Sequence, residues 1–312
     1  MLEILNTMLP VFALIVLGYA LAARRFLSKA FLDELNRLLF WVCLPALILH
    51  SMATAESLPA GTVRILALFW ILTLLLIGLA WAAARLLQLP RNRFGAFVQA
   101  AFRGNLAYVG IPILTFAVQD QGPAVLSSVL TQTALVFAPT MLLYNLASVA
   151  LLEWSRRTGE RTGLSRSLRS IGRNPLVLAS AAGALLFLAP FDLPGVLVDS
   201  LDFTGQIAAP ASLLCVGGGM AYVSIKGRYR SATVASLIKV LVSPLLAFVV
   251  ARLLGVEGQP LLVLMVLSAC PTAVASYIMA KEMEGDEALA SGAIVISTLL
   301  CIPGLALCLA LV

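Results

Sequence analysis

Residues 101–112 read Ala-Phe-Arg-Gly-Asn-Leu-Ala-Tyr-Val-Gly-Ile-Pro, inside an apolar run that extends from residue 95 to residue 118. Arg, Gly, Asn and Pro are poorly suited to the middle of a continuous helix in lipid, because they add polar groups or interrupt the backbone hydrogen bonds. Freed backbone groups at membrane depth are tolerated only where they line a cavity or meet a protein partner. The stretch therefore predicts a membrane-spanning helix that is broken near its middle, beside a binding site.

A second break is predicted near the other end of the chain, where residues 268–273 read Ser-Ala-Cys-Pro-Thr-Ala. Subtracting 165 from the position of Pro271 gives 106, which is next to Asn105. Similar offsets separate other matched residues, namely Pro10 and Pro175 (165), Pro45 and Pro210 (165), Pro139 and Pro303 (164), and Gly18 and Gly183 (165). The spacing indicates an internal repeat in which each copy contains one broken helix.

The composition places the chain among membrane proteins. Hydrophobic residues make up 61% of the chain, charged residues only 12%, and the mean hydropathy is +1.01, whereas soluble domains have about 25% charged residues. The apolar runs predict ten spans, at 4–23, 34–53, 63–87, 95–118, 124–152, 175–190, 196–224, 231–254, 260–280 and 287–311. Because one span takes roughly 20 residues, no room remains for a soluble catalytic domain. The prediction is an all-α polytopic membrane protein.

The repeat divides the chain into a first five-helix copy (1–152), a basic linker (153–174) and a second copy (175–312). Because five is an odd number of spans, the second copy must cross the membrane in the opposite direction. Inverted repeats are typical of secondary transporters, whose substrate site lies near the bilayer midplane between the copies. The alternative is a tandem duplication that produced a helical bundle without a transport role.

The positive charges predict the orientation. Seventeen of the 21 Lys and Arg residues lie in or beside the odd-numbered connections, and two, Arg64 and Arg252, lie near the even-numbered ones. Since cytoplasmic loops carry the excess of Lys and Arg, both termini are expected outside the cytoplasm. Glu3 before the first span, and Arg24 and Arg25 after it, indicate a retained helix rather than a signal peptide. The basic linker is explained by topology, so nothing indicates nucleic-acid binding.

The remaining two cations, Arg103 and Lys239, lie within predicted spans. The half-helices that begin after the breaks direct unsatisfied N–H groups toward the midplane, equivalent to roughly half a positive charge each. Together with Arg103 and the amide of Asn105, they favour an anion. Arg103 has two possible roles. Its side chain either meets a substrate carboxylate or a carbonyl-lined cavity, or it snorkels to the cytoplasmic side of the membrane. Lys239 is open to the same alternatives.

Other polar residues are weaker candidates. His50, the only histidine, lies near the outer end of the second span, where it is either a proton-coupling group or an interfacial polar residue. Gly217, Gly218 and Gly219 permit close helix packing or a local unwinding, and Asp199 or Asp202 could reach a cavity mouth. The five cysteines, odd in number and without a C-x-x-C pair, suggest neither disulfides nor a metal site. No cofactor is expected.

The sequence resembles the auxin efflux carrier family, which includes bacterial malonate and malate carriers and the plant PIN-type auxin exporters. The resemblance rests on Leu35-Asn36-Arg37, Leu44 to Ala53, Gly104 to Pro112, Pro271 to Glu282, Ser291-Gly292 and Ile302-Pro303, and covers essentially all ten spans. The Asn-x4-Gly-Ile-Pro signature together with Ala-Lys-Glu is its most specific part. The short central connection differs from the long regulated loop of the plant exporters, and favours a prokaryotic organic-acid carrier in the cell inner membrane.

The resemblance implies a fold similar to bile-acid sodium symporters and NhaA, with crossed broken helices four and nine. It implies a scaffold of helices 1, 2, 6 and 7 and a transport domain of helices 3, 4, 5, 8, 9 and 10 that moves by an elevator mechanism. Asn105 takes the place of the family's crossover asparagine, and Pro112 and Pro271 match its crossover prolines. A homodimer through the scaffold is also suggested, whereas the coupling ion, H⁺ or Na⁺, is left open.

These observations together predict a secondary transporter of small organic anions such as carboxylates. The expected substrate-binding residues are Arg103, Asn105, Tyr108, Pro271 and Thr272, the expected helix breaks are at Gly104, Gly110, Pro112 and Pro271, and the secondary candidates are Lys239 and His50. A membrane receptor or sensor that binds an anion without net flux is the alternative. An intramembrane enzyme is not expected, because no Asp or Glu lies at mid-depth and His50 has no nucleophile beside it.

Overall fold

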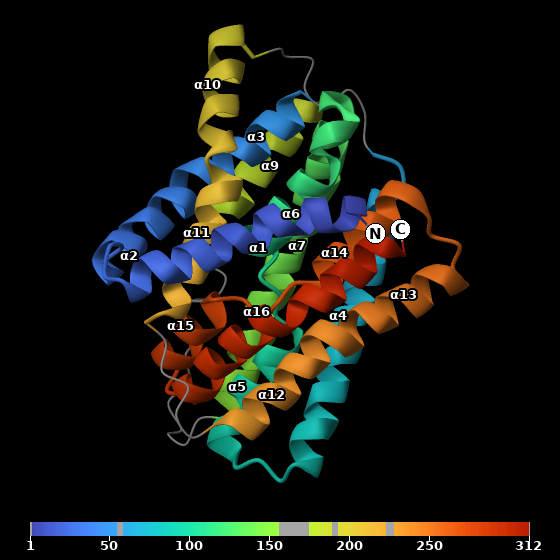
Figure 1. Ribbon diagram of the computed structural model, residues 1–312. Helices are drawn as coiled ribbons and strands as arrows, with labels where there is room; N and C mark the ends of the chain where they lie inside the picture. Colours follow the sequence, from blue (N-terminus) through green and yellow to red (C-terminus); the bar gives the residue numbers. More distant parts are fainter. Residues whose placement is uncertain (1, 55–58, 156–174, 189–192, 223–227, 312) are drawn as a thin grey trace. The chain divides into compact units, whose positions relative to one another are not determined.

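The computed structural model describes residues 2–54, 59–155, 175–188, 193–222 and 228–311, and these residues form helices together with one isolated backbone bridge (Figure 1). The α-helices are α1 (Leu2–Ala23), α2 (Lys29–Leu38), α3 (Leu44–Ala53), α4 (Thr62–Leu86), α5 (Arg91–Phe102), α6 (Ile111–Val118), α7 (Pro123–Ser155), α9 (Pro175–Leu188), α10 (Gly195–Gln206), α11 (Ala208–Met220), α12 (Tyr229–Leu237), α13 (Ser243–Leu253), α14 (Gly258–Ala269), α15 (Ala275–Glu282) and α16 (Glu287–Ala310). The predicted all-α class is confirmed. Most of the predicted linker, residues 156–174, lies outside the described residues.

Three short π-helical segments each lead directly into an α-helix. These are η1 (Leu39–Cys43), η2 (Leu106–Gly110) and η4 (Ile238–Val242). Each is followed directly by an α-helix that has a proline in its first turn, Pro45, Pro112 or Pro244. Proline lacks the N–H for the i→i−4 bond and crowds the carbonyl four residues earlier, and a widened turn relieves both problems. Two predicted spans, 34–53 and 231–254, are therefore each a helix with a π-helical interruption.

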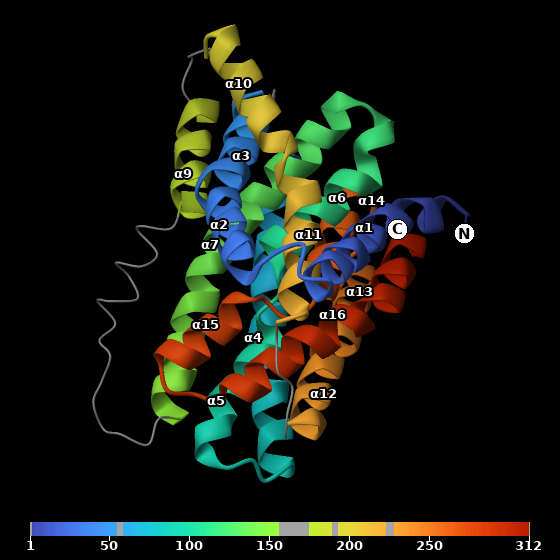
Figure 2. The same cartoon turned by 60° about the vertical axis from the view of Figure 1, so that its left-hand side comes forward.

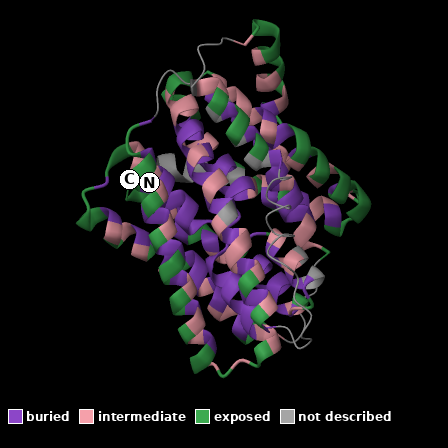
Figure 3. Ribbon diagram, turned by 180° about the vertical axis from the view of Figure 1, so that it is seen from behind, coloured by how far each residue is buried: buried purple, intermediate pink, exposed green. Residues whose placement is uncertain are grey.

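Four helices of the described residues are long and apolar enough to cross a membrane: α4, α7, the α12–α13 segment (Tyr229–Leu253) and α16. Phe12–Ala23 and α14 are shorter apolar helices. The exposed residues of α4 include Ile71, Leu74, Leu75 and Leu79, so this helix presents apolar side chains on its exposed surface as well as toward its neighbours. Figure 3 shows the alternation of buried and exposed residues along the long helices. Apolar side chains on the exposed as well as the buried surface are typical of helices in lipid. The predicted number of ten spans and their inverted repeat stay predictions.

The chain forms two compact units, and each unit combines segments from both halves of the sequence. Unit 1 contains residues 1–64, 107–141 and 171–222, and unit 2 contains residues 65–106, 142–170 and 223–312. The break in the fourth predicted span therefore coincides with a unit boundary, with α5 in unit 2 and α6 in unit 1. The compact units and the predicted sequence repeats are different divisions of the chain.

Unit 1 is organised around three close helix contacts. α1 packs along α11, and α3 packs against α9 and α10 (Figure 2). A Cβ atom added to Gly217 would lie 1.8 Å from the carbonyl oxygen of Ile15, and one added to Gly18 would lie 2.3 Å from that of Leu214. Only glycine allows the backbones of α1 and α11 to approach this closely.

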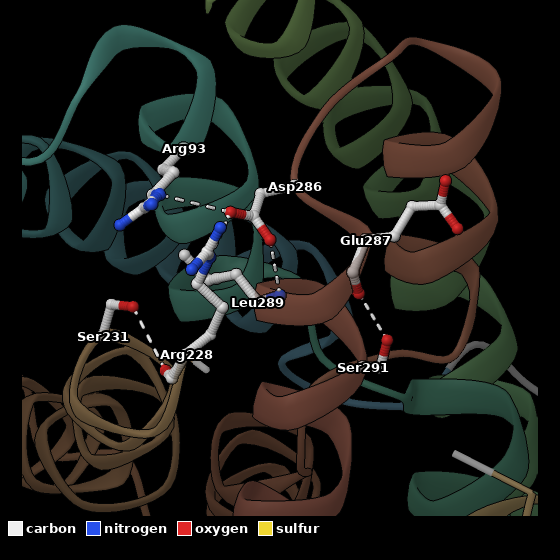
Figure 4. Close-up of polar contacts among 7 residues, drawn as sticks. All are labelled: Arg93, Arg228, Ser231, Asp286, Glu287, Leu289 and Ser291. Carbon is white, nitrogen blue, oxygen red and sulfur yellow. Dashed lines mark hydrogen bonds and ion pairs between the residues drawn. The ribbon is translucent and has the colours of Figure 1, made fainter. Parts of the chain in front are cut away.

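Unit 2 contains most of α4, all of α5, the end of α7, and the helices from α12 to α16. α12 and α16 pack together, and both contact α5. An acidic residue ties the first turns of these three helices to one another (Figure 4). Asp286 is the N-cap of α16, where its Oδ1 accepts a 2.9 Å hydrogen bond from the Leu289 N–H. Its Oδ2 accepts a 2.7 Å hydrogen bond from Arg228 Nε and lies 3.4 Å from Arg93 Nε.

Candidate functional site

Two interrupted segments of unit 2 cross each other. α5 ends at Phe102 and α14 ends at Ala269, and an extended stretch follows each helix. Gly104 and Thr272 pair as an isolated antiparallel bridge between these stretches. The Asn105 N–H donates to the Pro271 carbonyl at 2.7 Å, and the Ala273 N–H donates to the Arg103 carbonyl at 2.9 Å. The structure therefore brings Arg103, Gly104, Asn105, Pro271 and Thr272 together, and we call residues 103–105 with residues 270–273 the crossover.

Side chains and neighbouring helices satisfy the backbone groups that the breaks leave free. Ser297 of α16 accepts a 2.9 Å hydrogen bond from the Thr272 N–H. The Thr272 hydroxyl in turn donates to the Ala100 carbonyl of α5 at 2.8 Å. Asn105 is only 5% exposed and Thr272 is fully buried. An irregular backbone can persist at this depth because freed groups such as the Thr272 N–H and the Ala100 carbonyl meet protein partners.

Arg103 follows the last residue of α5, and its side chain is buried, with 5% of its surface exposed. Its Nη2 donates to Asn145 Oδ1 at 2.8 Å, and its Nη1 donates to Ser148 Oγ at 3.2 Å. Both partners belong to α7 and both are neutral. The guanidinium carbon lies 6.0 Å from the centre of the Tyr144 ring, and the Nε–H is buried without a hydrogen-bond partner among the described residues.

Lys239 is the second buried cation of unit 2, with 1% of its surface exposed. Its ammonium donates to the Ser268 carbonyl at 2.7 Å, in the last turn of α14, and the Ser243 hydroxyl donates to the same oxygen at 2.9 Å. A Cβ atom added to Gly104 would lie 3.1 Å from Lys239 Cε. The ammonium therefore lies beside the crossover, and Gly104 leaves the room for it.

The charges around the crossover are of one sign. Within the described residues, neither Arg103 nor Lys239 forms an ion pair with an acidic side chain. A buried charge without a counter-charge is costly in a medium of low dielectric constant. Carbonyl, amide and hydroxyl oxygens reduce this cost, and an anion would reduce it further. The arrangement is suited to binding a carboxylate or a similar anion.

The other predicted residues lie outside this group. Tyr108, in unit 1, donates its hydroxyl to the Asn36 carbonyl at 3.3 Å. Gly110 ends η2, and Pro112 lies in the first turn of α6. His50 Nδ1 lies 3.7 Å from Asp202 Oδ1, also within unit 1. The roles of these residues in substrate binding stay predictions. The described residues contain no group of His, Cys, Asp and Glu arranged to hold a metal ion.

Sequence reasoning missed the partners of the two cations. Asn145 and Ser148 are three residues apart, so they share one face of α7, and an amide in the middle of an apolar span was a signal that could have been used. Tyr144 lies on the same segment, and its hydroxyl interacts with the Gly104 backbone and the Thr73 side chain. Ser268 and Ser297 gave no signal, because isolated serines are common in membrane helices.

Apolar helices and a buried crossover of two broken segments define a polytopic helical membrane protein. Comparison with known sequences then identifies the family: residues 3–309 match the membrane transport protein family, and the chain belongs to it. The chain is 25% identical over 304 residues to a protein of Methanothermobacter thermautotrophicus named as an uncharacterized transporter, covering 97% of this chain and 96% of the relative. The protein is thus a membrane transporter and not an enzyme.

Two further relatives carry more specific names. A Rhizobium meliloti protein named as a malonate transporter is 26% identical over 313 residues, covering 96% of this chain and 93% of the relative. A rice (Oryza sativa subsp. japonica) protein named as an auxin efflux carrier component is 28% identical over 156 residues, covering 46% of this chain and 42% of the relative. The resemblance to the auxin efflux carrier family is confirmed.

Proposed function

We propose that this transporter carries small organic anions with one or more carboxylates, and that the crossover in unit 2 is its binding site. The observation that carries the proposal is Arg103, which is buried at the crossover with neutral partners and whose Nε–H has no hydrogen-bond partner within the described part of the chain. A carboxylate that accepted this N–H would supply the counter-charge that the described residues lack. The names of the Rhizobium and rice relatives support the same class of substrate.

The transport cycle in this proposal is elevator-type alternating access. The crossover and Lys239 belong to one compact unit, so a bound anion would travel with that unit. The other unit contains the predicted scaffold spans 4–23, 34–53 and 175–190, the span 196–224 up to residue 222, and residues 107–141 of two predicted transport spans. The membrane in this proposal is the inner membrane, and both termini lie outside the cytoplasm, as the distribution of Lys and Arg favours.

The experiment is uptake of radiolabelled mono- and dicarboxylates into proteoliposomes that contain the purified protein. We expect saturable uptake of at least one short-chain carboxylate, and competition between carboxylates that share the site. Arg103→Ala and Asn105→Ala should each weaken uptake while the protein remains monodisperse in detergent. Normal uptake by both variants would contradict the site assignment. Carboxylate binding without flux in any direction would favour the receptor alternative.

A further inference from the structure

We propose that the Lys239 ammonium supplies the positive charge at the C-terminal end of α14, beside the crossover, where an unwound helix end could otherwise bind Na⁺, so that transport requires no Na⁺. The inference rests on the proposed function, because it concerns the ion requirement of the same site. In this inference the Lys239 ammonium interacts with the C-terminal end of α14 and not with the substrate. Arg103 is then the cation that meets the substrate anion.

The C-terminal end of α14 attracts positive charge. The helix stops at Ala269 in a buried environment, and Cys270 after it has ψ 138°, so the last carbonyls of α14 cannot continue the helical ladder. The C-terminal end of a helix carries roughly half a negative charge. In transporters with broken helices, such ends and the unwound carbonyls beside them coordinate Na⁺.

Lys239 already occupies this position. Its Nζ lies 2.7 Å from the Ser268 carbonyl oxygen, and 1% of the residue is exposed. The residue is in the π-helical segment η4, within the span that packs against α14. Its hydrogen bond goes to a helix end and not to an acidic side chain. Its charge therefore offsets the partial negative charge of the α14 C-terminus, which is present whether or not a substrate is bound. A second cation bound there would meet both the ammonium charge and its volume.

The same geometry predicts what the position becomes without the ammonium. Three oxygen atoms then remain at the end of α14: the Ser268 carbonyl, the Ser243 hydroxyl that now donates to it, and the Ser268 hydroxyl, which is buried and has no hydrogen-bond partner among the residues that the structure describes. Carbonyl and hydroxyl oxygens are suitable ligands for hard cations. Lys239→Ser adds a further hydroxyl and leaves space, whereas Lys239→Met keeps the volume of the side chain and removes only its charge. The two variants separate a need for positive charge from a need for packing.

The first measurement is thermal unfolding in detergent, in NaCl, LiCl or choline chloride at equal ionic strength. The wild type should unfold at the same temperature in all three salts. Lys239→Ser should unfold at a lower temperature in choline chloride. In NaCl its unfolding temperature should rise by about 2–4 °C, as expected when the Na⁺ concentration is about ten times the dissociation constant of the site. Lys239→Met should be destabilised in every salt alike. Arg252→Gln, which removes an exposed cation from the end of the same span, is the control and should behave as the wild type does.

The second measurement is carboxylate flux into proteoliposomes with Na⁺ replaced by choline. The wild type should keep its full rate, and Lys239→Ser should lose at least about tenfold in choline and recover severalfold with Na⁺. A Na⁺ requirement of the wild type would overturn the inference, as would a salt-specific unfolding temperature of the wild type. If Lys239→Ser does not fold, these two wild-type measurements still decide. Absence of any carboxylate flux would instead refute the proposed function, while the unfolding measurements would still test Lys239.

Discussion

The Thr272 backbone is held at the crossover from two sides: it pairs with Gly104 as an antiparallel bridge, and its N–H donates to Ser297 Oγ at 2.9 Å. The bridge joins two segments that are distant in sequence, and Ser297 fixes their position against α16. The hydroxyl of Ser297 is therefore part of the structure of the break and not a surface polar group. Its removal would leave a buried N–H without a partner.

Ser297→Ala should accordingly lower the free energy of unfolding by about 1–3 kcal/mol, the cost of an unsatisfied buried donor. Ser291→Ala is the matched control in the same helix, because the Ser291 hydroxyl donates only to the Glu287 carbonyl within α16. The control should change stability by less than about 0.5 kcal/mol. Denaturant or thermal unfolding of both variants in detergent measures the difference. Equal effects of the two substitutions would show that Ser297 does not support the crossover.

Gly217 and Gly219 of α11 provide a test of the contact between α1 and α11. A Cβ atom at Gly217 would lie 1.8 Å from the Ile15 carbonyl oxygen, whereas one at Gly219 would meet no atom within 4 Å. Gly217→Ala should therefore force the helices apart and cost at least about 3 kcal/mol. Gly219→Ala should stabilise the protein by up to about 1 kcal/mol, since alanine is the better helix former. Thermal unfolding in one detergent compares the two, and a mild effect of Gly217→Ala would contradict the close packing.

The sequence predicted the places where the helices break better than it predicted what surrounds them. Proline and glycine change the backbone locally, so Gly104 and Pro271 could be assigned to breaks from their position in apolar runs. The side chains that meet Arg103 and Lys239 depend on packing between distant segments, which no local pattern records. Asn145 and Ser268 were missed for this reason. The π-helical turns before Pro45, Pro112 and Pro244 were missed because periodicity does not distinguish one widened turn within a long apolar run.

Asp286 combines a helix cap with an ion-pair cluster, and two substitutions can separate these roles (Figure 4). Asp286→Asn keeps an oxygen that can accept from the Leu289 N–H but removes the charge that meets Arg228 and Arg93. Asp286→Ala removes both interactions. We expect a loss of about 1–3 kcal/mol for Asn, because hydrogen bonds to charged groups are lost, and about 1 kcal/mol more for Ala from the lost cap. Unfolding at low and high salt checks this, and equal stability of the two variants would contradict a capping role.

Substitutions of Asn145 give the most direct test of whether the substrate anion neutralises the charge of Arg103. In the structure, Asn145 Oδ1 accepts a 2.8 Å hydrogen bond from Arg103 Nη2 and adds no charge. Asn145→Asp changes the amide to a carboxylate of nearly the same size, and thus supplies an internal counter-ion that competes with any substrate carboxylate. The resulting charge-assisted hydrogen bond is stronger than the neutral one. The variant should keep or raise the unfolding temperature of the wild type, while carboxylate uptake falls at least about tenfold, equivalent to 1.4 kcal/mol of binding.

Asn145→Ala is the comparison variant. If Asn145 had only a structural role, the Ala and Asp substitutions would change stability and uptake in the same direction. Alanine leaves Arg103 Nη2 buried and unpaired, so this variant should unfold at a lower temperature, with a loss of about 1–3 kcal/mol. The opposite directions of the two stability changes, together with loss of uptake in the Asp variant, would identify Arg103 as the group that a substrate anion neutralises. Wild-type uptake by a stable Asn145→Asp protein would mean that the anion does not depend on this charge, and the binding site would then have to lie elsewhere.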